Sequence, residues 1–380
     1  MGKFGKKVSI SLNMLDYGIC LLGESGIGKT TLACEVCEKL VGDEGYIHFD
    51  IGRERGNNAI EGIVSEKIEN WAKLNEVIDD ITENKETDYP KLNVVIWDTL
   101  DELILLAEAE SIRQYNKKQS AMPNGHKVDT IDAAWAGFGR GQAFAMELIL
   151  NAFDKLNNVG ISNFIIAHVK RTEIVDAITQ ETYSKLTADT TQRYFNAIKN
   201  KQHFIALAYI DREIVKEKTG RKNVVTKEDI TVSKAVKESR VISFRDDTYS
   251  VDSKCRFASI VDRIPFDTDE FIKAITDAIE AEKTKNGKTM AEAEKEQKVR
   301  DKQKAQKATE ASAKAREQKN TEVLEAKRED FISVISANFS SADDDVKAKA
   351  KAMLAESGAK KFTDEALPIE TLKAISELFE

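Results

Sequence analysis

The stretch Gly23–Thr30 constrains the fold more than any other part of the sequence. It reads G-E-S-G-I-G-K-T, which matches the pattern G-x-x-x-x-G-K-[ST]. The apolar run Ile19–Leu22 precedes it and an amphipathic helical pattern follows it, so the expected context is a strand, a glycine-rich turn and a helix. Glycines let backbone N–H groups curve around phosphates, and the helix N-terminus adds a positive dipole. The sequence therefore predicts a P-loop that binds a nucleoside triphosphate.

The polar residues of this motif each have an expected role. Lys29 should neutralise the β- and γ-phosphates of ATP, and the Thr30 hydroxyl should bind Mg²⁺. A second element supports this assignment: the apolar strand predicted at Val94–Trp97 ends in Asp98, a carboxylate suited to holding Mg²⁺ through a water, with Thr99 assisting. The residues predicted to contact the nucleotide are Gly23, Glu24, Ser25, Gly26, Ile27, Gly28, Lys29, Thr30 and Thr31.

Hydrolysis also requires a group that orients or deprotonates the attacking water. Asp50 is the first candidate, because it follows the strand predicted at Tyr46–Phe49. Glu54 and Glu102 are the alternatives. Each carboxylate could equally serve as a helix cap or a surface charge, because spacing alone does not fix its geometry.

The composition limits the class of protein. A length of 380 residues favours about two domains. No apolar run approaches the roughly 18 residues that span a bilayer, and Met1–Lys7 is basic without a following apolar stretch, so we expect a cytoplasmic protein with no membrane partner. Cys34 and Cys37 form a C-x-x-C in a predicted helix, and the lack of a second ligand pair favours packing over zinc or redox chemistry. The net charge of −8 argues against a globally basic protein but permits a local basic surface.

The first two thirds of the chain alternate short β-rich runs with longer helical patterns, which indicates an α/β fold with a mostly parallel sheet flanked by helices. Strands are predicted at 8–12, 19–22, 46–49, 94–97, 164–167 and 204–210. Helices are predicted after residue 29 and at 60–82, 102–115 and 141–157. A β-rich stretch at 230–257 predicts an antiparallel extension of the sheet.

The composition then changes twice, and these changes set the predicted domain boundaries. Residues 1–282 form the predicted core. Residues 283–329 are rich in Lys, Glu, Ala and Gln without an apolar seam, which indicates a charged helical linker. Residues 330–380 regain helical apolar periodicity and predict a small C-terminal helical module.

The motifs together resemble the RecA-like P-loop core, and more closely the phage-encoded AAA-type nucleotide-binding proteins that include the Sak-type single-strand annealing ATPases. The resemblance covers roughly residues 10 to 280. In such families the strand after the Mg²⁺-binding strand ends in a polar residue that senses the γ-phosphate, and His168 occupies that place; a strand-end cap is the alternative. The matching features are residues 23–31, Asp50, residues 96–99, the Gly137-Phe138-Gly139 region and residues 164–168.

The same resemblance implies assembly. RecA-like and DnaB-like ATPases often carry a K-x-R pair on a late strand that reaches the nucleotide of a neighbouring subunit, and Lys254 and Arg256 match this pair. Two residues apart on a strand, they would share one face. We expect a homo-oligomer, a ring or a filament, in which they act in trans; the alternative is a pair of exposed cations on an edge strand.

A local excess of positive charge indicates a nucleic-acid surface. Residues 193–240 contain twelve Lys and Arg against six Asp and Glu. In RecA-like proteins the loops that correspond to 115–135 and 170–201 contact single-stranded DNA, so Lys117, Lys118, Lys170 and Arg171 are the candidate contacts. Solvated charged faces are the ordinary alternative.

The resulting prediction is an ATPase that acts on single-stranded DNA in phage recombination, by annealing or strand exchange, or in replication. The first alternative is a replicative helicase or a helicase loader. The second is an ATP-dependent scaffold that recruits a protein partner through its C-terminal module and never contacts DNA.

Overall fold

The protein forms two compact units, residues 1–309 and residues 310–380. The computed structural model describes residues 10–53, 60–176, 179–222, 229–245, 253–285, 289–364 and 366–379. The first unit extends beyond the predicted core boundary at 282, because the beginning of helix α7 (Met290–Asn338) is bonded to the N-terminal segment. Gln297 Oε1 accepts from Leu12 N at 2.8 Å, and Lys304 Nζ lies 2.6 Å from Asp16 Oδ1.

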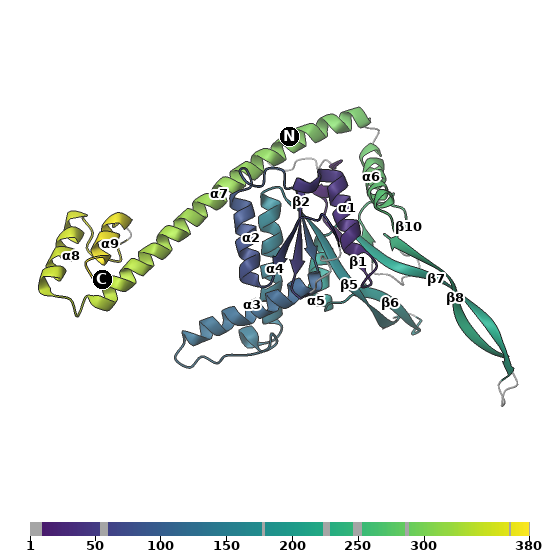
Figure 1. Ribbon diagram of the computed structural model, residues 1–380, viewed down its shortest axis with the longest axis horizontal. Helices are drawn as coiled ribbons and strands as arrows, with labels where there is room; N and C mark the ends of the chain where they lie inside the picture. The colour runs from purple at the N-terminus through teal and green to yellow at the C-terminus, as the bar shows by residue number, and fades with distance from the viewer. Residues whose placement is uncertain are drawn as a thin grey trace. The chain divides into compact units, whose positions relative to one another are not determined.

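A sheet of ten described strands forms the centre of the first unit (Figure 1). Its order is β10-β8-β7-β1-β5-β4-β2-β3, with β6 paired to β5 and β9 paired to β7. The strands are β1 (Ile19–Gly23), β2 (Tyr46–Ile51), β3 (Ser65–Ile68), β4 (Val94–Asp98), β5 (Ser162–Val175), β6 (Thr182–Ala188), β7 (Phe204–Lys222), β8 (Asp229–Ser243), β9 (Lys254–Cys255) and β10 (Arg263–Pro265).

The centre of the sheet is parallel and its extension is antiparallel, which confirms the predicted fold class. β1 pairs in parallel with β5 and β7, and β4 pairs in parallel with β2 and β5. β8 pairs antiparallel with β7 and β10. Because Gly23 lies opposite His168, and Asp98 lies opposite both Ile166 and Asp50, the carboxyl ends of four strands meet at one edge.

Helices cover both faces of the sheet. They are α1 (Lys29–Val41), α2 (Trp71–Glu83), α3 (Leu100–Ser120), α4 (Arg140–Asn158), α5 (Gln192–Lys201) and α6 (Thr268–Thr284), with short 3-10 turns η1 (Met14–Asp16), η2 (Asp43–Gly45) and η4 (Ala134–Ala136). Side-chain caps fix two of the starts: Asn70 accepts from Lys73 N before α2, and Asp267 accepts from Asp269 N before α6.

Successive side chains of the central strands point to opposite faces of the sheet, where they form two apolar layers. On one face α1 and α6 pack against side chains such as Leu21 and Ile166. On the other face Trp97, which is fully buried, packs edge-on against Phe153 of α4 with ring centroids 4.8 Å apart. Cys34 belongs to the first layer, where burial raises the pKa of its thiol to about 12, in keeping with the predicted packing role.

Four local predictions were wrong. Residues 65–68, placed in a predicted helix at 60–82, form β3, because they pair with β2 at a sheet edge where a strand needs few apolar side chains. The predicted loop 170–201 is a β5–β6 hairpin followed by α5, and the predicted loop 115–135 begins as the last turns of α3. Residues 10–12, the described part of a predicted strand, are irregular.

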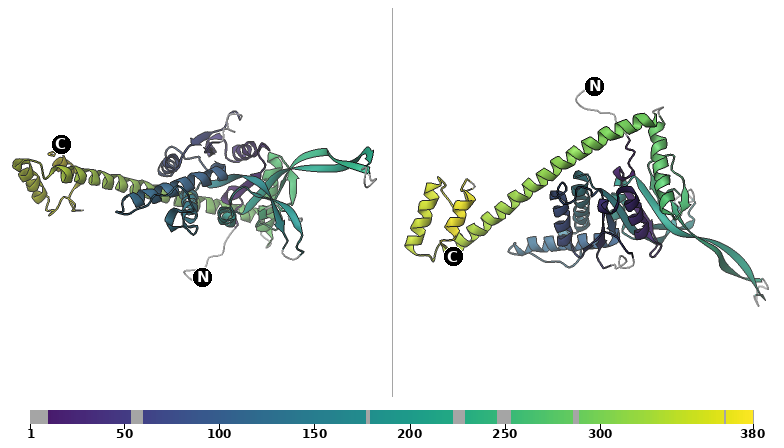
Figure 2. Two further views of the ribbon diagram at one scale, coloured as in Figure 1. Left: turned by 90° about the horizontal axis from the view of Figure 1, so that it is seen from below. Right: turned by 45° about the horizontal axis from the view of Figure 1, so that its top comes forward.

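Two strand pairs extend past the carboxyl edge of the sheet. β5 continues beyond His168 to Val175 and pairs with β6. β7 continues beyond Ala208 to Lys222 and pairs with β8 as a long two-stranded ribbon (Figures 1 and 2). Among the described residues, no helix has the length and apolar character needed to cross a bilayer.

The second unit has a hydrophobic core of its own. It consists of the end of α7, α8 (Asp344–Glu356) and α9 (Ile369–Ser376). Ile335, Leu354 and Leu372 belong to its buried core. Arg328 ties α7 to the segment before α9 by donating to Leu367 O at 2.8 Å.

Candidate functional site

The glycine-rich loop connects the centre of the sheet to the N-terminus of α1. It begins at Gly23, where an added Cβ would lie 2.9 Å from Ala208 O of the neighbouring strand, so the tight packing requires glycine. Gly26 and Gly28 have φ values of +75° and +106°, a left-handed backbone that glycine adopts without strain. The loop therefore curves back into the helix start with its N–H groups available to an anion.

The Lys29 side chain lies inside the curve of this loop. The residue is only 6% exposed, and its Nζ donates to Gly23 O and to Glu24 O, each at 3.0 Å. These two bonds fix the ammonium group where phosphates on the loop would meet it.

Thr30 and Asp98 meet although they are far apart in the sequence. Thr30 Oγ1 donates to Asp98 Oδ2 at 2.5 Å, which joins the first turn of α1 to the end of β4. Asp98 is 9% exposed; burial alone would raise its pKa, but hydrogen bonds from His48 and Thr30 and the charge of Lys29 outweigh burial and lower the pKa. Asp98 is therefore a carboxylate at neutral pH.

His48 is a residue of this site that the sequence analysis missed. It is 1% exposed, and its Nε2 lies 3.0 Å from Asp98 Oδ2 while its Nδ1 lies 3.0 Å from Ser65 Oγ. When the Ser65 hydroxyl donates to Nδ1, Nε2 carries the proton and donates to Asp98. No sequence signal marks His48, because its partners come from two other strands.

His168 ends the sheet portion of β5 beside the loop. Its Nδ1 lies 2.7 Å from Asp101 Oδ2. The other oxygen, Asp101 Oδ1, and the hydroxyl of Thr99 are buried without a hydrogen-bond partner among the described residues. Two unsatisfied polar atoms beside the loop indicate a place for a water or a ligand group.

The three carboxylates predicted as candidates for the general base have different surroundings. Asp50 is 5% exposed, neighbours Asp98 in register, and pairs with Lys67 at 3.0 Å. Glu102 lies at the start of α3, and its Oε2 accepts from Arg53 N at 3.3 Å. Glu54 lies outside the described residues.

Lys254 and Arg256 are not brought to the loop. β9 pairs with the first residues of β7, so it lies at the amino edge of the sheet. There Lys254 Nζ donates to Lys199 O at 2.7 Å, and Arg256 Nη2 donates to Asn200 O at 2.5 Å. Both cations thus bind C-terminal carbonyls of α5, a position that favours positive charge.

Arg240 of β8 approaches the loop instead. Its Nη1 donates to Ile27 O at 3.2 Å, and its guanidinium lies 5.6 Å from the centroid of the Phe266 ring. An added Cβ at Gly28 would lie 3.4 Å from the Phe266 ring and 3.8 Å from Arg240 Nη1. No local sequence pattern singles out Arg240, because 213 residues separate it from Ile27 of the loop.

The residues at the carboxyl edge fit a nucleotide with its divalent cation. Thr30 and Asp98 offer two oxygen ligands of the kind that Mg²⁺ prefers. Among the described residues, no cluster of three or more His, Cys, Asp or Glu could hold a metal alone, so phosphate and water oxygens would have to complete its coordination.

Comparison with protein-family models matches residues 16–254 to a family described as AAA domain. The matched segment covers more than half of the chain and includes the glycine-rich loop, Asp98 and His168. Comparison with curated proteins found no match.

Proposed function

The chain belongs to the AAA domain family of P-loop nucleoside triphosphatases, and on that premise we propose that it hydrolyses ATP with Mg²⁺ and acts on single-stranded DNA. The observation that carries the proposed hydrolysis is the contact between Thr30 Oγ1 and Asp98 Oδ2 beside the buried Lys29. The nucleotide contacts would come from the loop 23–31.

Each side chain of the site has a specific task in this proposal. Lys29 would neutralise charge that develops on the transferred phosphoryl group, and Thr30 and Asp98 would hold Mg²⁺, which would offset the charge of the phosphates. His168, which Asp101 orients, would contact the γ-phosphate.

Asp50 remains the proposed general base. It lies next to Asp98 in register, and Lys67 holds its Oδ1. Glu102 is the second candidate, because it lies at the start of α3 beside the backbone of Arg53. The base must come within hydrogen-bond reach of the attacking water, so Asp50→Asn and Glu102→Gln variants separate the two.

His48 is expected to orient Asp98 as a ligand of Mg²⁺. We expect His48→Ala to raise the Mg²⁺ concentration for half-maximal ATPase activity about tenfold, because partners that orient a metal ligand typically contribute 10- to 100-fold to metal affinity. His48→Gln keeps an N–H donor and should shift this concentration less. Equal shifts in the two variants would show that His48 fills space and does not orient Asp98.

Several features at the carboxyl edge support DNA contact. Lys118 lies 5.6 Å from the Trp135 ring centroid, and Phe138 is 96% exposed. Trp135, Ala136 and Phe138 all have positive φ, a costly backbone for residues other than glycine. An exposed aromatic ring such as Phe138 suits stacking on unpaired bases, and a cation such as Lys118 suits contact with their phosphates. Lys170 and Arg171 stand on the neighbouring β5–β6 hairpin.

The test of this interface is the salt dependence of single-stranded DNA binding. Each phosphate contact contributes about 0.7 to the slope of log affinity against log salt, so replacing Lys117 and Lys118 with Ser should lower the slope by about 1.4. Replacing Lys170 and Arg171 should do the same. Replacing Lys298 and Lys302, exposed on α7, is the matched control and should change nothing. ATPase rates with and without DNA, over a range of protein concentration, complete the test.

We further propose that this activity serves phage recombination, by annealing or strand exchange, or replication, within the host cytoplasm. Processive unwinding would favour a helicase, or a helicase loader acting beside one. Failure to bind DNA in either nucleotide state would favour a scaffold. In each case the second unit, which has its own core, is the proposed site for a protein partner.

A further inference from the structure

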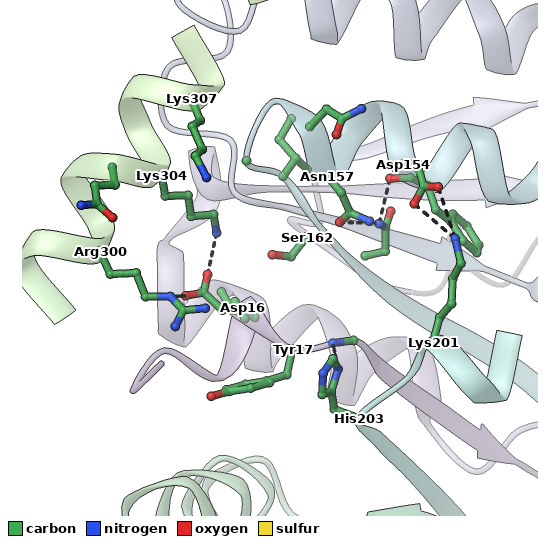
Figure 3. A pocket seen from close by; sticks show the side chains of 18 of the residues that line it. Asp16, Tyr17, Asp154, Asn157, Ser162, Lys201, His203, Arg300, Lys304 and Lys307 are labelled. Carbon is green, nitrogen blue, oxygen red and sulfur yellow. Dashed lines mark hydrogen bonds and ion pairs between the residues drawn. The ribbon is translucent and has the colours of Figure 1, made fainter. Parts of the chain in front are cut away.

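A cavity of about 1040 Å³ lies at the amino edge of the sheet, at the opposite end of β1 from the glycine-rich loop (Figure 3). Its walls come from the start of β1, the connection from α4 to β5, the connection from α5 to β7, and the first turns of α7. Its volume is of the size that small ligands occupy in proteins. No role in the proposed hydrolysis involves these residues.

The rim of the cavity carries an excess of positive charge. The lining cations are Lys201, Lys295, Arg300, Lys304 and Lys307, against the lining carboxylates Asp16, Asp154 and Glu296. Every one of these carboxylates is already held by a cation: Asp16 by Lys304 at 2.6 Å, Asp154 by Lys201 at 3.2 Å, and Glu296 by Lys283 at 3.0 Å.

Lys295 and Lys307 are the cations that remain. Neither forms a hydrogen bond or an ion pair with another residue that the structure describes. Lys307 lies twelve residues beyond Lys295 on α7, a rise of about 18 Å, so the two stand at different points of the cavity wall. An anion that enters could pair with either ammonium group without displacing an existing ion pair.

The floor adds neutral donors and aromatic surface. His203 Nδ1 accepts from Gly18 N at 3.2 Å, so the ring proton is on Nε2, a donor without a partner among the described residues. Burial lowers the pKa of His203, and the charges of Arg256 and Lys254 lower it further, so the ring is neutral at neutral pH. Tyr17 presents its ring edge-on to His203 at 5.2 Å.

Gln202 supplies an acceptor that has no donor. The residue is 5% exposed, and its Oε1 has no hydrogen-bond partner within the described chain. This oxygen lies against Gly18, where an added Cβ would come within 2.2 Å of it, and both residues line the cavity. An unsatisfied buried acceptor of this kind indicates a missing donor.

We propose that this cavity binds a nucleotide, with the base against Tyr17 and His203 and the phosphate at the α7 wall, where Lys295 and Lys307 have no partner among the described residues. A phosphate can pair with one of these cations, a planar base fits the aromatic walls, and an N–H group of the base can satisfy Gln202 Oε1. Free nucleotides and the 5′ end of a DNA strand both carry this chemistry.

Equilibrium dialysis of the full chain tests the proposal. The P-loop is first saturated with Mg·ADP, and two probes are then titrated separately: labelled AMP and a 5′-phosphorylated deoxyadenosine pentanucleotide. We expect one further equivalent to bind and Lys295→Glu with Lys307→Glu to weaken it at least tenfold. Lys298→Glu with Lys302→Glu makes the same charge change on the same helix outside the cavity and should leave binding unchanged.

The outcomes separate this site from the P-loop. Binding that persists in Lys29→Ala supports a second site, and preference for one probe identifies a free nucleotide or a strand end as the natural source. Absence of a further equivalent with both probes overturns the proposal, as does equal weakening by the two double variants, which would mean only general attraction to a basic helix.

Discussion

Lys29→Ala is expected to lower the ATP turnover number by a factor of about 10³. The substitution removes the buried ammonium group from the loop and with it charge-assisted hydrogen bonds to the developing transition state. Because Lys29 donates to carbonyls of the loop itself, its loss should affect the loop before it affects the sheet. Steady-state ATPase assays with circular dichroism check both parts of this expectation.

Lys39→Ala is the matched control for that experiment. Lys39 stands on the same helix, but its side chain pairs with Asp269 on the surface. This variant should keep ordinary turnover. Ordinary turnover in Lys29→Ala itself would remove the P-loop from the proposed chemistry.

Replacing both Lys254 and Arg256 with Ala should lower turnover by about 10³ to 10⁵ while nucleotide affinity stays largely intact, if they act as trans fingers. In their own chain they lie at the amino edge of the sheet, whereas the P-loop lies at the carboxyl edge. They can therefore reach a nucleotide only on a neighbouring subunit, and specific activity should rise with protein concentration until assembly is complete.

Mixing variants distinguishes this role from helix capping. Lys29→Ala subunits retain Lys254 and Arg256, and the double variant retains its P-loop, so a mixed assembly should regain part of the activity. If the mixture co-assembles and stays inactive, and the double variant also melts at lower temperature, the two cations serve only to cap α5.

The parts of the site that depend on local sequence were predictable. A P-loop needs glycines at fixed spacing between a strand and a helix, so residues 23–30 specify it without help from the rest of the chain. The position of Asp98 was almost as predictable, because an apolar strand that ends in an aspartate is also a local sequence pattern. The fold class followed because each central strand is buried on both faces and shows a short apolar run.

The parts that depend on distant pairing were not predictable. β3 contains Ser65, Glu66 and Lys67, and only its register with β2 makes it a strand. The outer half of β5 is half exposed and polar, so it lacks the apolar run that marks its inner half. His48 and Arg240 join the site through partners 50 and 213 residues away, and no spacing rule connects residues across such separations.

The place of β1 in the sheet has a consequence for biosynthesis. All five residues of β1 are buried, and the strand lies between β5 and β7, with Ile19 opposite Phe164 and Phe204. Of these two neighbours, β7 is translated later, roughly 185 residues after β1. At about 5–20 residues per second this is a delay of roughly 10 to 40 s. Throughout that time β1 lacks at least one of its two neighbouring strands, so the nascent chain carries an apolar strand with an open edge. A ribosome that stalls before Phe204 would therefore release an aggregation-prone fragment, and chaperone capture should be strongest over this interval.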